Sequence, residues 1–174
     1  MPTLRVILAT TTQHLAHAAT LFREYAAGLP QSAQCSLAHQ GFEAELAGLP
    51  GKYARPHGCI LLAYSEQHST DADALGVVAL RPMDSSGTRP GDPTPICEMK
   101  RMFVRPTTRG TGAGRALAHQ LLAFARTANY RMMKLDTEPD FIPAVTLYRS
   151  LGFVDVPRYN DDPVSCTLWM GLHL

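Results

Sequence analysis

Hydrophobic residues recur along the chain with two spacings, one typical of helices and one typical of strands. Helical spacing predicts helices over residues 13–27, 36–46, 112–129 and 142–151. Short apolar runs between turn residues predict strands over residues 4–9, 59–64, 74–80, 96–104, 132–135, 153–154 and 167–172. Strands and helices that alternate in this way predict an α/β (or α+β) protein built on one sheet with one core.

Polar and turn-forming residues separate these elements. Residues 65–73 predict a polar hairpin-type connection, and residues 84–95, rich in Pro, Gly, Ser, Thr and Asp, predict a flexible loop. Pro106 ends the strand before it, and Gly152 supplies the C-terminal cap of the last helix. The chain has 174 residues and no internal repeat, so residues 1–174 are predicted to form a single domain.

Composition removes several classes of function. The net charge of +1 argues against a nucleic-acid partner, which normally requires a large basic excess. Apolar runs are far shorter than the roughly 18 residues of a membrane span, and the N-terminus is a poor signal peptide, so we expect a cytoplasmic protein without a membrane partner. The four cysteines have no metal-ligand spacing and predict free thiols and no metal site. They are Cys35, Cys59, Cys97 and Cys166.

The net charge is close to zero, but one window of the chain is strongly basic. It surrounds a turn with three glycines, Gly110 to Gly114. From Glu98 to Arg115 there are five cations and one anion, so this window carries +4 and the rest of the chain −3. Glycines let several N–H groups point at one ligand, and the helix that follows adds unpaired N–H donors and the positive end of its dipole. A strand, this turn and a helix in succession predict a phosphate site rather than a solvated connection.

The glycine spacing excludes two common phosphate motifs. No lysine follows the glycines as a P-loop requires, and a dinucleotide fingerprint fails because its sixth position is Arg115 or Leu117. The pattern present is Arg109-x-x-Gly112-x-Gly114, after a strand that ends in Val-Arg-Pro.

This pattern resembles the acyl-CoA-binding motif of the GNAT superfamily of N-acetyltransferases. Residues 144–153, AVTLYRSLGF, resemble the A-x-x-x-Y-x-x-x-G-F signature of the same superfamily, and the order of elements matches over nearly the whole chain. The resemblance implies a single mixed central sheet of about seven strands flanked by about four helices. It also implies an acyltransferase that moves an acetyl group from acetyl-CoA to an amine without a metal.

The resemblance assigns the cofactor site to two stretches. The N–H groups of the glycine turn, together with the Arg115 side chain, would hold the pyrophosphate of acetyl-CoA. Those turn residues are Arg109, Gly110, Thr111, Gly112, Ala113 and Gly114. The backbone of Met102, Phe103 and Val104 would bind the pantetheine arm. Many members carry Asn three positions before Ala144; Phe141 stands there, so that contact is lost or replaced.

Two residues are candidates for the proton transfers that amine acetylation requires. Tyr148 occupies the position of the family's tyrosine and is the candidate acid for the departing thiolate; its alternative role is to pack or position. Glu98 is the candidate base. A charge pair between Glu98 and Lys100 or Arg101 is the alternative, and a water chain would then accept the proton.

The acceptor is expected to be the amine of a small molecule or peptide. The resemblance places its site at residues 24–55 and 158–164, where acidic side chains either attract an amine or are solvated, and Leu135 to Thr137 are a further candidate wall. The acidic residues are Glu24, Glu43, Glu45, Asp161 and Asp162. Two alternatives remain: a non-catalytic acyl-CoA-binding or regulatory module, and an enzyme that acetylates protein lysines or N-termini. A homodimer is also left open.

Overall fold

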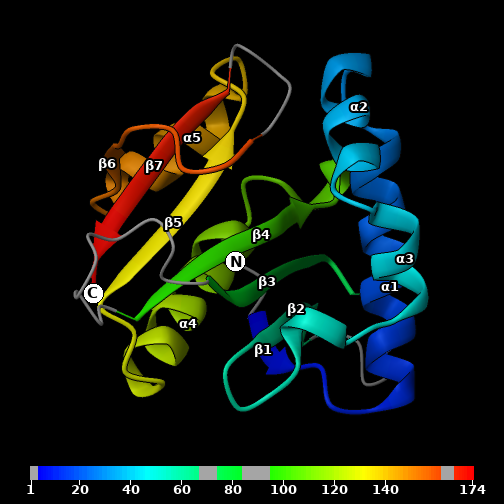
Figure 1. The fold of residues 1–174 in the computed structure, drawn as a ribbon. Coiled ribbons are helices and arrows are strands. Elements are labelled where there is room, and N and C mark those ends of the chain that lie inside the picture. Colours follow the sequence, from blue (N-terminus) through cyan, green and yellow to red (C-terminus); the bar gives the residue numbers. More distant parts are fainter. Residues whose placement is uncertain (1–3, 67–73, 84–94, 162–166) are drawn as a thin grey trace.

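The computed structural model describes residues 4–66, 74–83, 95–161 and 167–174, and a seven-stranded sheet runs through them (Figure 1). Its order is β1-β2-β3-β4-β5-β7-β6. The strands are β1 (Leu4–Leu8), β2 (Cys59–Ser65), β3 (Gly76–Met83), β4 (Ile96–Val104), β5 (Met132–Thr137), β6 (Val154–Asp155) and β7 (Leu168–His173). Neighbouring strands are antiparallel except β4 and β5, which are parallel, so the sheet is mixed as expected.

Helices cover both faces of the sheet. One face carries α1 (Thr12–Ala27), α2 (Gln31–His39) and α3 (Phe42–Ala47); the other carries α4 (Ala113–Thr127) and α5 (Ile142–Ser150) (Figure 1). Two short 3₁₀ turns, η1 (Gly51–Tyr53) and η3 (Pro106–Thr108), complete the described elements. No helix in these residues is long and apolar enough to cross a membrane.

Strand β2 shows how the sequence produces these three layers. Ile60 and Leu62 pack into the cluster that contains α1, whereas Leu61 and Ala63 pack into the cluster that contains α4. All four side chains are at most 2% exposed, because successive side chains of a strand face opposite sides and both sides are covered. Continuous apolar runs such as this one therefore mark strands that are covered on both faces of the sheet.

One predicted helix is two helices in the structure. The stretch 36–46 divides between α2 and α3, because Gly41 adopts φ +73°, a left-handed conformation that interrupts the helical hydrogen bonds. The described chain consequently has five α-helices instead of about four. The strand expected at 74–80 lies at Gly76–Met83, and the other elements begin and end within two residues of prediction. Most of the two predicted connections, at 67–73 and 84–94, lies outside the described residues.

The parallel strands β4 and β5 pair only over their first three residues, from Ile96 opposite Met132 to Glu98 opposite Lys134. Beyond these pairs they separate, as Figure 1 shows. The nine-residue strand β4 continues beside β3 alone, so the edge of β4 that faces β5 has no strand partner from Met99 onward. This separation creates the site described next.

Candidate active site

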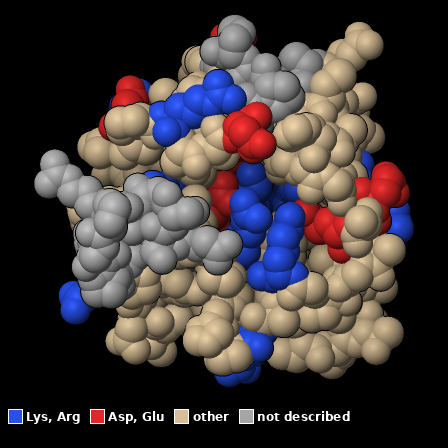
Figure 2. Space-filling model, viewed as in Figure 1, with Lys and Arg blue, Asp and Glu red and all other residues tan. Residues whose placement is uncertain are grey.

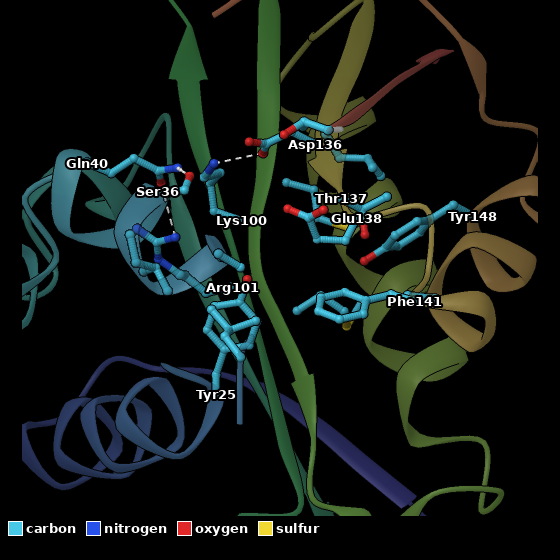
Figure 3. Close-up of a pocket in the computed structure, with 18 residues that line it drawn as sticks. Tyr25, Ser36, Gln40, Lys100, Arg101, Asp136, Thr137, Glu138, Phe141 and Tyr148 are labelled. Carbon is cyan, nitrogen blue, oxygen red and sulfur yellow. Dashed lines mark hydrogen bonds and ion pairs between the residues drawn. The ribbon is translucent and has the colours of Figure 1, made fainter. Parts of the chain in front are cut away.

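A pocket opens where β4 and β5 separate, and residues of α1, α2 and α5 complete its walls (Figure 3). β4 contributes Met99, Lys100, Arg101 and Met102, and β5 with the residue after it contributes Leu135, Asp136, Thr137 and Glu138. The opposite walls come from Tyr25 of α1, from Ser36 and Leu37 of α2 with Gln40 directly after it, and from Phe141, Ala144 and Tyr148 at α5. On the molecular surface the hollow has a floor of Lys and Arg with carboxylates on either side (Figure 2).

Lys100 is the centre of one chain of ion pairs beneath the pocket. Its Nζ lies 2.8 Å from Oδ1 of Asp136 and 3.5 Å from Oε1 of Glu98. Glu98 is completely buried; Oε2 accepts from Arg81 at 2.6 Å, and Oε1 accepts from the hydroxyl of Tyr159 at 3.0 Å. Burial lowers the pKa of Lys100, but the two carboxylates outweigh it and raise the pKa, so the ammonium stays charged.

Arg101 is held by a second group of charges, which comes from α3 and its neighbours. Its Nε and Nη2 donate to the two carboxylate oxygens of Glu45 at 2.8 and 2.9 Å, and Nη1 donates to Gln40 at 3.2 Å. Lys52 also pairs with Glu45. Burial alone would raise the pKa of Glu45; the hydrogen bonds and charges of Arg101 and Lys52 outweigh it and lower the pKa to about 2.

This lowered pKa predicts loss of stability in acid. The carboxylate of Glu45 is favoured in the folded state, so its contribution is complete above about pH 4.5, its ordinary pKa, and is lost as the pH falls towards 2. We expect E45Q to lower the free energy of unfolding by about 3 kcal/mol at pH 7 and by much less near pH 2.5, measured by urea unfolding. Glu43, exposed two positions away, is the control, and a constant difference for E45Q at both pH values would contradict the assignment.

Tyr148 projects from α5 into the pocket (Figure 3). The residue is 6% exposed and its ring packs on Phe153, with 5.9 Å between ring centroids. Burial, with a smaller effect of nearby Tyr25 and Asp136, raises the pKa of its hydroxyl above the ordinary value of 10. Its hydroxyl has no hydrogen-bond partner within the described parts of the chain, so it is a protonated donor free to serve a ligand.

Glu98, the candidate base, lies behind the pocket. It is not among the described residues that line the pocket, and both of its oxygens are engaged by Arg81, Tyr159 and Lys100. The pair with Lys100 is one of the alternatives weighed from the sequence. Within the described residues, no group of three or more His, Cys, Asp or Glu side chains could hold a metal ion.

The glycine turn begins α4 as expected and presents a row of free backbone N–H groups. Within the described residues, the N–H groups of residues 110–115 have no hydrogen-bond acceptor, and no side chain caps the helix. Gly110 and Gly112 adopt φ +82° and +90°, where a β-carbon would be strained. Arg115 donates to Ser150 of α5 at 3.1 Å, which joins this turn to the helix that carries Tyr148. Such a row of donors at a helix start suits an anion.

The basic window of the sequence does not gather at this turn. Arg105 forms a bidentate pair with Glu24 of α1, at 2.7 and 2.9 Å, and Lys100 and Arg101 are paired at the pocket. Arg109 and Arg115 remain at the turn, exposed and without a carboxylate partner in the described chain. The window therefore divides between two places, and its charges are largely neutralised by carboxylates distant in sequence.

The remaining predicted residues fall on both sides of the pocket. Met102 lines it, and Phe103 and Val104 are half-buried at the end of β4. Asp136 and Thr137 line it too, as the sequence suggested. Of the acidic residues expected to attract an amine, Glu24 and Glu45 accept hydrogen bonds from Arg105 and Arg101. Glu43 is exposed, and a carboxylate oxygen of Asp161 lies 3.8 Å from Nε2 of His39. Asp162 to Val164 and Cys166 lie outside the described residues.

The sequence did not single out four polar wall residues, Tyr25, Ser36, Gln40 and Glu138, although the first three lie within the range 24–55 expected to form the acceptor site. Tyr25 belongs to the apolar stripe of α1 and was counted as part of the helix's packing face. Ser36 and Gln40 lie four residues apart and so share one side of α2, but an interval of this kind between two polar residues occurs on any solvated helix. No local signal marked them.

Comparison with known proteins decides the family. Residues 20–153 match the model of the acetyltransferase (GNAT) family. The chain belongs to this family. An uncharacterised N-acetyltransferase of Schizosaccharomyces pombe is 37% identical over 138 residues, which cover 79% of this chain and 77% of that protein. The N-acetylaspartate synthetase of Rattus norvegicus is 32% identical over 110 residues, 63% of this chain and 32% of that protein.

Solved structures of GNAT-like proteins share the fold. A GNAT-family acetyltransferase from Staphylococcus aureus superposes with a TM-score of 0.69 at 16% identity, covering 98% of this chain and 99% of the other. An acetyltransferase structure from Salmonella typhimurium, solved with its cofactor acetyl-CoA, superposes with a TM-score of 0.62 at 15% identity. The match covers 98% of this chain and 93% of the other. As a GNAT member, the chain is an acyltransferase with the mixed α/β fold expected from its sequence.

Proposed function

We propose that this protein transfers the acetyl group of acetyl-CoA to a primary amine of a small molecule. The observation that carries the proposal is the row of free N–H groups at residues 110–115, joined through Arg115 and Ser150 to the helix whose Tyr148 enters the pocket. A pyrophosphate on that row would direct the rest of acetyl-CoA along β4 towards Tyr148. The Salmonella structure, which holds acetyl-CoA on a similar fold, supports this cofactor.

The free edge of β4 supports a site for the pantetheine arm. Because the β4–β5 pairing stops at Glu98, the backbone between Met99 and Val104 has no β5 partner on that side. Pantetheine contains two amides, which can add to this edge as a short strand would. Phe141 lies in the wall where many relatives place an asparagine, so it would contact this arm by packing only.

The chemical step is a direct attack. The neutral amine nitrogen attacks the thioester carbonyl carbon, a C–N bond forms, and the C–S bond breaks. The amine enters as an ammonium and ends as an amide, so it releases two protons. We assign Tyr148 as the donor that protonates the departing thiolate. One of the two released amine protons then restores the Tyr148 hydroxyl, and the other goes to solvent.

The first proton leaves the ammonium before the attack. Direct transfer to Glu98 would require its ion pair with Arg81 and its bond from Tyr159 to open, because the carboxylate is fully buried. A water chain in the pocket avoids this cost. We therefore assign the proton to water and assign Glu98 the role of holding Lys100 and Arg81 in place.

The walls of the pocket support a small acceptor. Side chains from α1, α2, β4, β5 and α5 surround it, whereas an enzyme that acts on protein chains would need a long open groove. Ser36, Gln40 and Asp136 provide polar contacts on two of these walls.

Turnover of acetyl-CoA against a panel of small amines tests the proposal. We expect release of free CoA that depends on at least one primary amine, with the N-acetylated amine as the product, identified by mass spectrometry. Calorimetry with acetyl-CoA runs beside it. If acetyl-CoA binds but no amine releases CoA, the regulatory-module alternative replaces the proposed enzyme; if a lysine-containing peptide alone reacts, the acceptor assignment is wrong.

A further inference from the structure

Lys100 and Arg101 follow one another on β4, yet both line the pocket (Figure 3). Neighbouring residues of a regular strand face opposite sides of the sheet. The exception has a local cause: Val77 pairs with Phe103 but Ala79 pairs with Lys100, so two residues of β4 stand opposite Val78. This β-bulge redirects the chain and brings both cations to one face.

The bulge holds Arg101 in an unfavourable conformation. Its φ is +57°, and Asn129 is the other non-glycine residue with positive φ in the described chain. Left-handed backbone is disfavoured for long side chains such as arginine and is retained where the surroundings require it, often at binding sites. Here the strained residue is buried, with 4% of its surface exposed, and its guanidinium is fixed by Glu45 and Gln40.

Both cations keep donors that their partners do not use. Arg101 has five N–H groups, of which three donate to Glu45 and Gln40, so one N–H on each Nη has no acceptor in the described residues. Lys100 has three N–H groups and two carboxylate contacts, with Asp136 and Glu98. These buried donors lie at a pocket, where a bound ligand can supply the acceptor.

The other side of the pocket has the opposite charge. Asp136, at the end of β5, is paired with Lys100, whereas Glu138, the residue after β5, lines the pocket near Tyr148 (Figure 3). A ligand that spans the pocket thus meets the cations of β4 at one end and the carboxylate of Glu138 at the other, close to the group proposed to serve the thioester sulfur. This pattern fits a zwitterion with its carboxylate at β4 and its ammonium near β5.

We propose that the acetyl acceptor is an amino acid whose carboxylate binds the free N–H groups of Lys100 and Arg101. The inference rests on the proposed acetyltransferase function and specifies its substrate class. The two remaining Nη N–H groups of Arg101 donate to the carboxylate oxygens, and Lys100 adds a third donor. The amino group of the ligand then points towards Tyr148. Amines of the same size without a carboxylate offer these donors a neutral acceptor or none, and therefore bind more weakly.

The test compares each of four amino acids with its α-carboxamide as acceptor: L-alanine, L-aspartate, L-phenylalanine and L-lysine. We expect kcat/KM for at least one amino acid to exceed that of its amide by tenfold or more. K100Q should reduce this ratio at least tenfold, mainly through KM of the amino acid. K100R, which keeps the charge, should retain most of the preference.

K52Q is the matched control, because Lys52 belongs to the charge group of the neighbouring Arg101 through Glu45 but is not a lining residue. Its ratio of amino acid to amide should stay that of the wild type. If amides are acetylated as well as amino acids, or if K100Q and K52Q act alike, the inference is overturned while the acetyltransferase proposal stands. If no amine is acetylated at all, calorimetry with succinate on wild type and K100Q decides: binding that requires Lys100 supports the carboxylate site, and absence of binding overturns it.

Discussion

Y148F is expected to lower kcat for amine acetylation by about 10²–10³-fold, with KM for acetyl-CoA changed by less than about threefold. The substitution removes only the hydroxyl that we assign to the departing thiolate, while the ring can still pack on Phe153. Because burial raises the pKa of Tyr148, this hydroxyl keeps its proton through neutral pH. The wild-type rate should therefore show no loss from ionisation of Tyr148 below about pH 10.

Y130F is the matched control for this change. The hydroxyl of Tyr130 donates to the carbonyl of His57 at 2.7 Å, and Tyr130 is not a lining residue. Losing that bond should cost about 1 kcal/mol in unfolding free energy and leave kcat unchanged. A fall of kcat in Y130F equal to that in Y148F, or full activity of Y148F, would assign Tyr148 to packing alone.

G112A should weaken acetyl-CoA binding by about tenfold or more, measured by calorimetry without acceptor. Gly112 adopts φ +90°, and a β-carbon there would meet no atom of the described residues within 4 Å. The strain turns the backbone and misdirects the N–H groups that follow, which we assign to the pyrophosphate. The unfolding free energy should also fall, by about 1–2 kcal/mol.

Gly41 separates the loss of stability from the loss of binding. It has φ +73°, equally open surroundings and a place on the turn between α2 and α3, away from the start of α4. G41A should cost similar stability and leave the Kd for acetyl-CoA within about twofold. If both variants weaken acetyl-CoA alike, strain rather than the phosphate cradle explains the effect.

The sequence predicted those parts of the fold and site that depend on local patterns. Apolar periodicity located the sheet and most helices, and the spacing of Arg109, Gly112 and Gly114 located the turn with its free N–H groups. Two motifs identified the family that the comparison confirmed. Each of these features is encoded within about 20 neighbouring residues, so a single stretch of chain was sufficient to recognise it.

Features that depend on tertiary contacts were not predicted. The charge window was interpreted as one basic region, but Glu24, Glu45 and Asp136 neutralise most of it from other elements. Regular alternation predicts Lys100 and Arg101 on opposite faces, and only the bulge against β3 brings them together. The interruption at Gly41 was missed because glycine also occurs inside helices, and the sequence does not give the φ of +73° that this glycine adopts.

The structure of a complex with acetyl-CoA tests the central claim most directly. We predict that the pyrophosphate oxygens accept from the N–H groups of residues 110–115, that the pantetheine arm follows the free edge of β4, and that the sulfur lies within hydrogen-bond reach of the Tyr148 hydroxyl. Phosphates bound elsewhere on the molecule, or a thioester remote from Tyr148, would contradict the account.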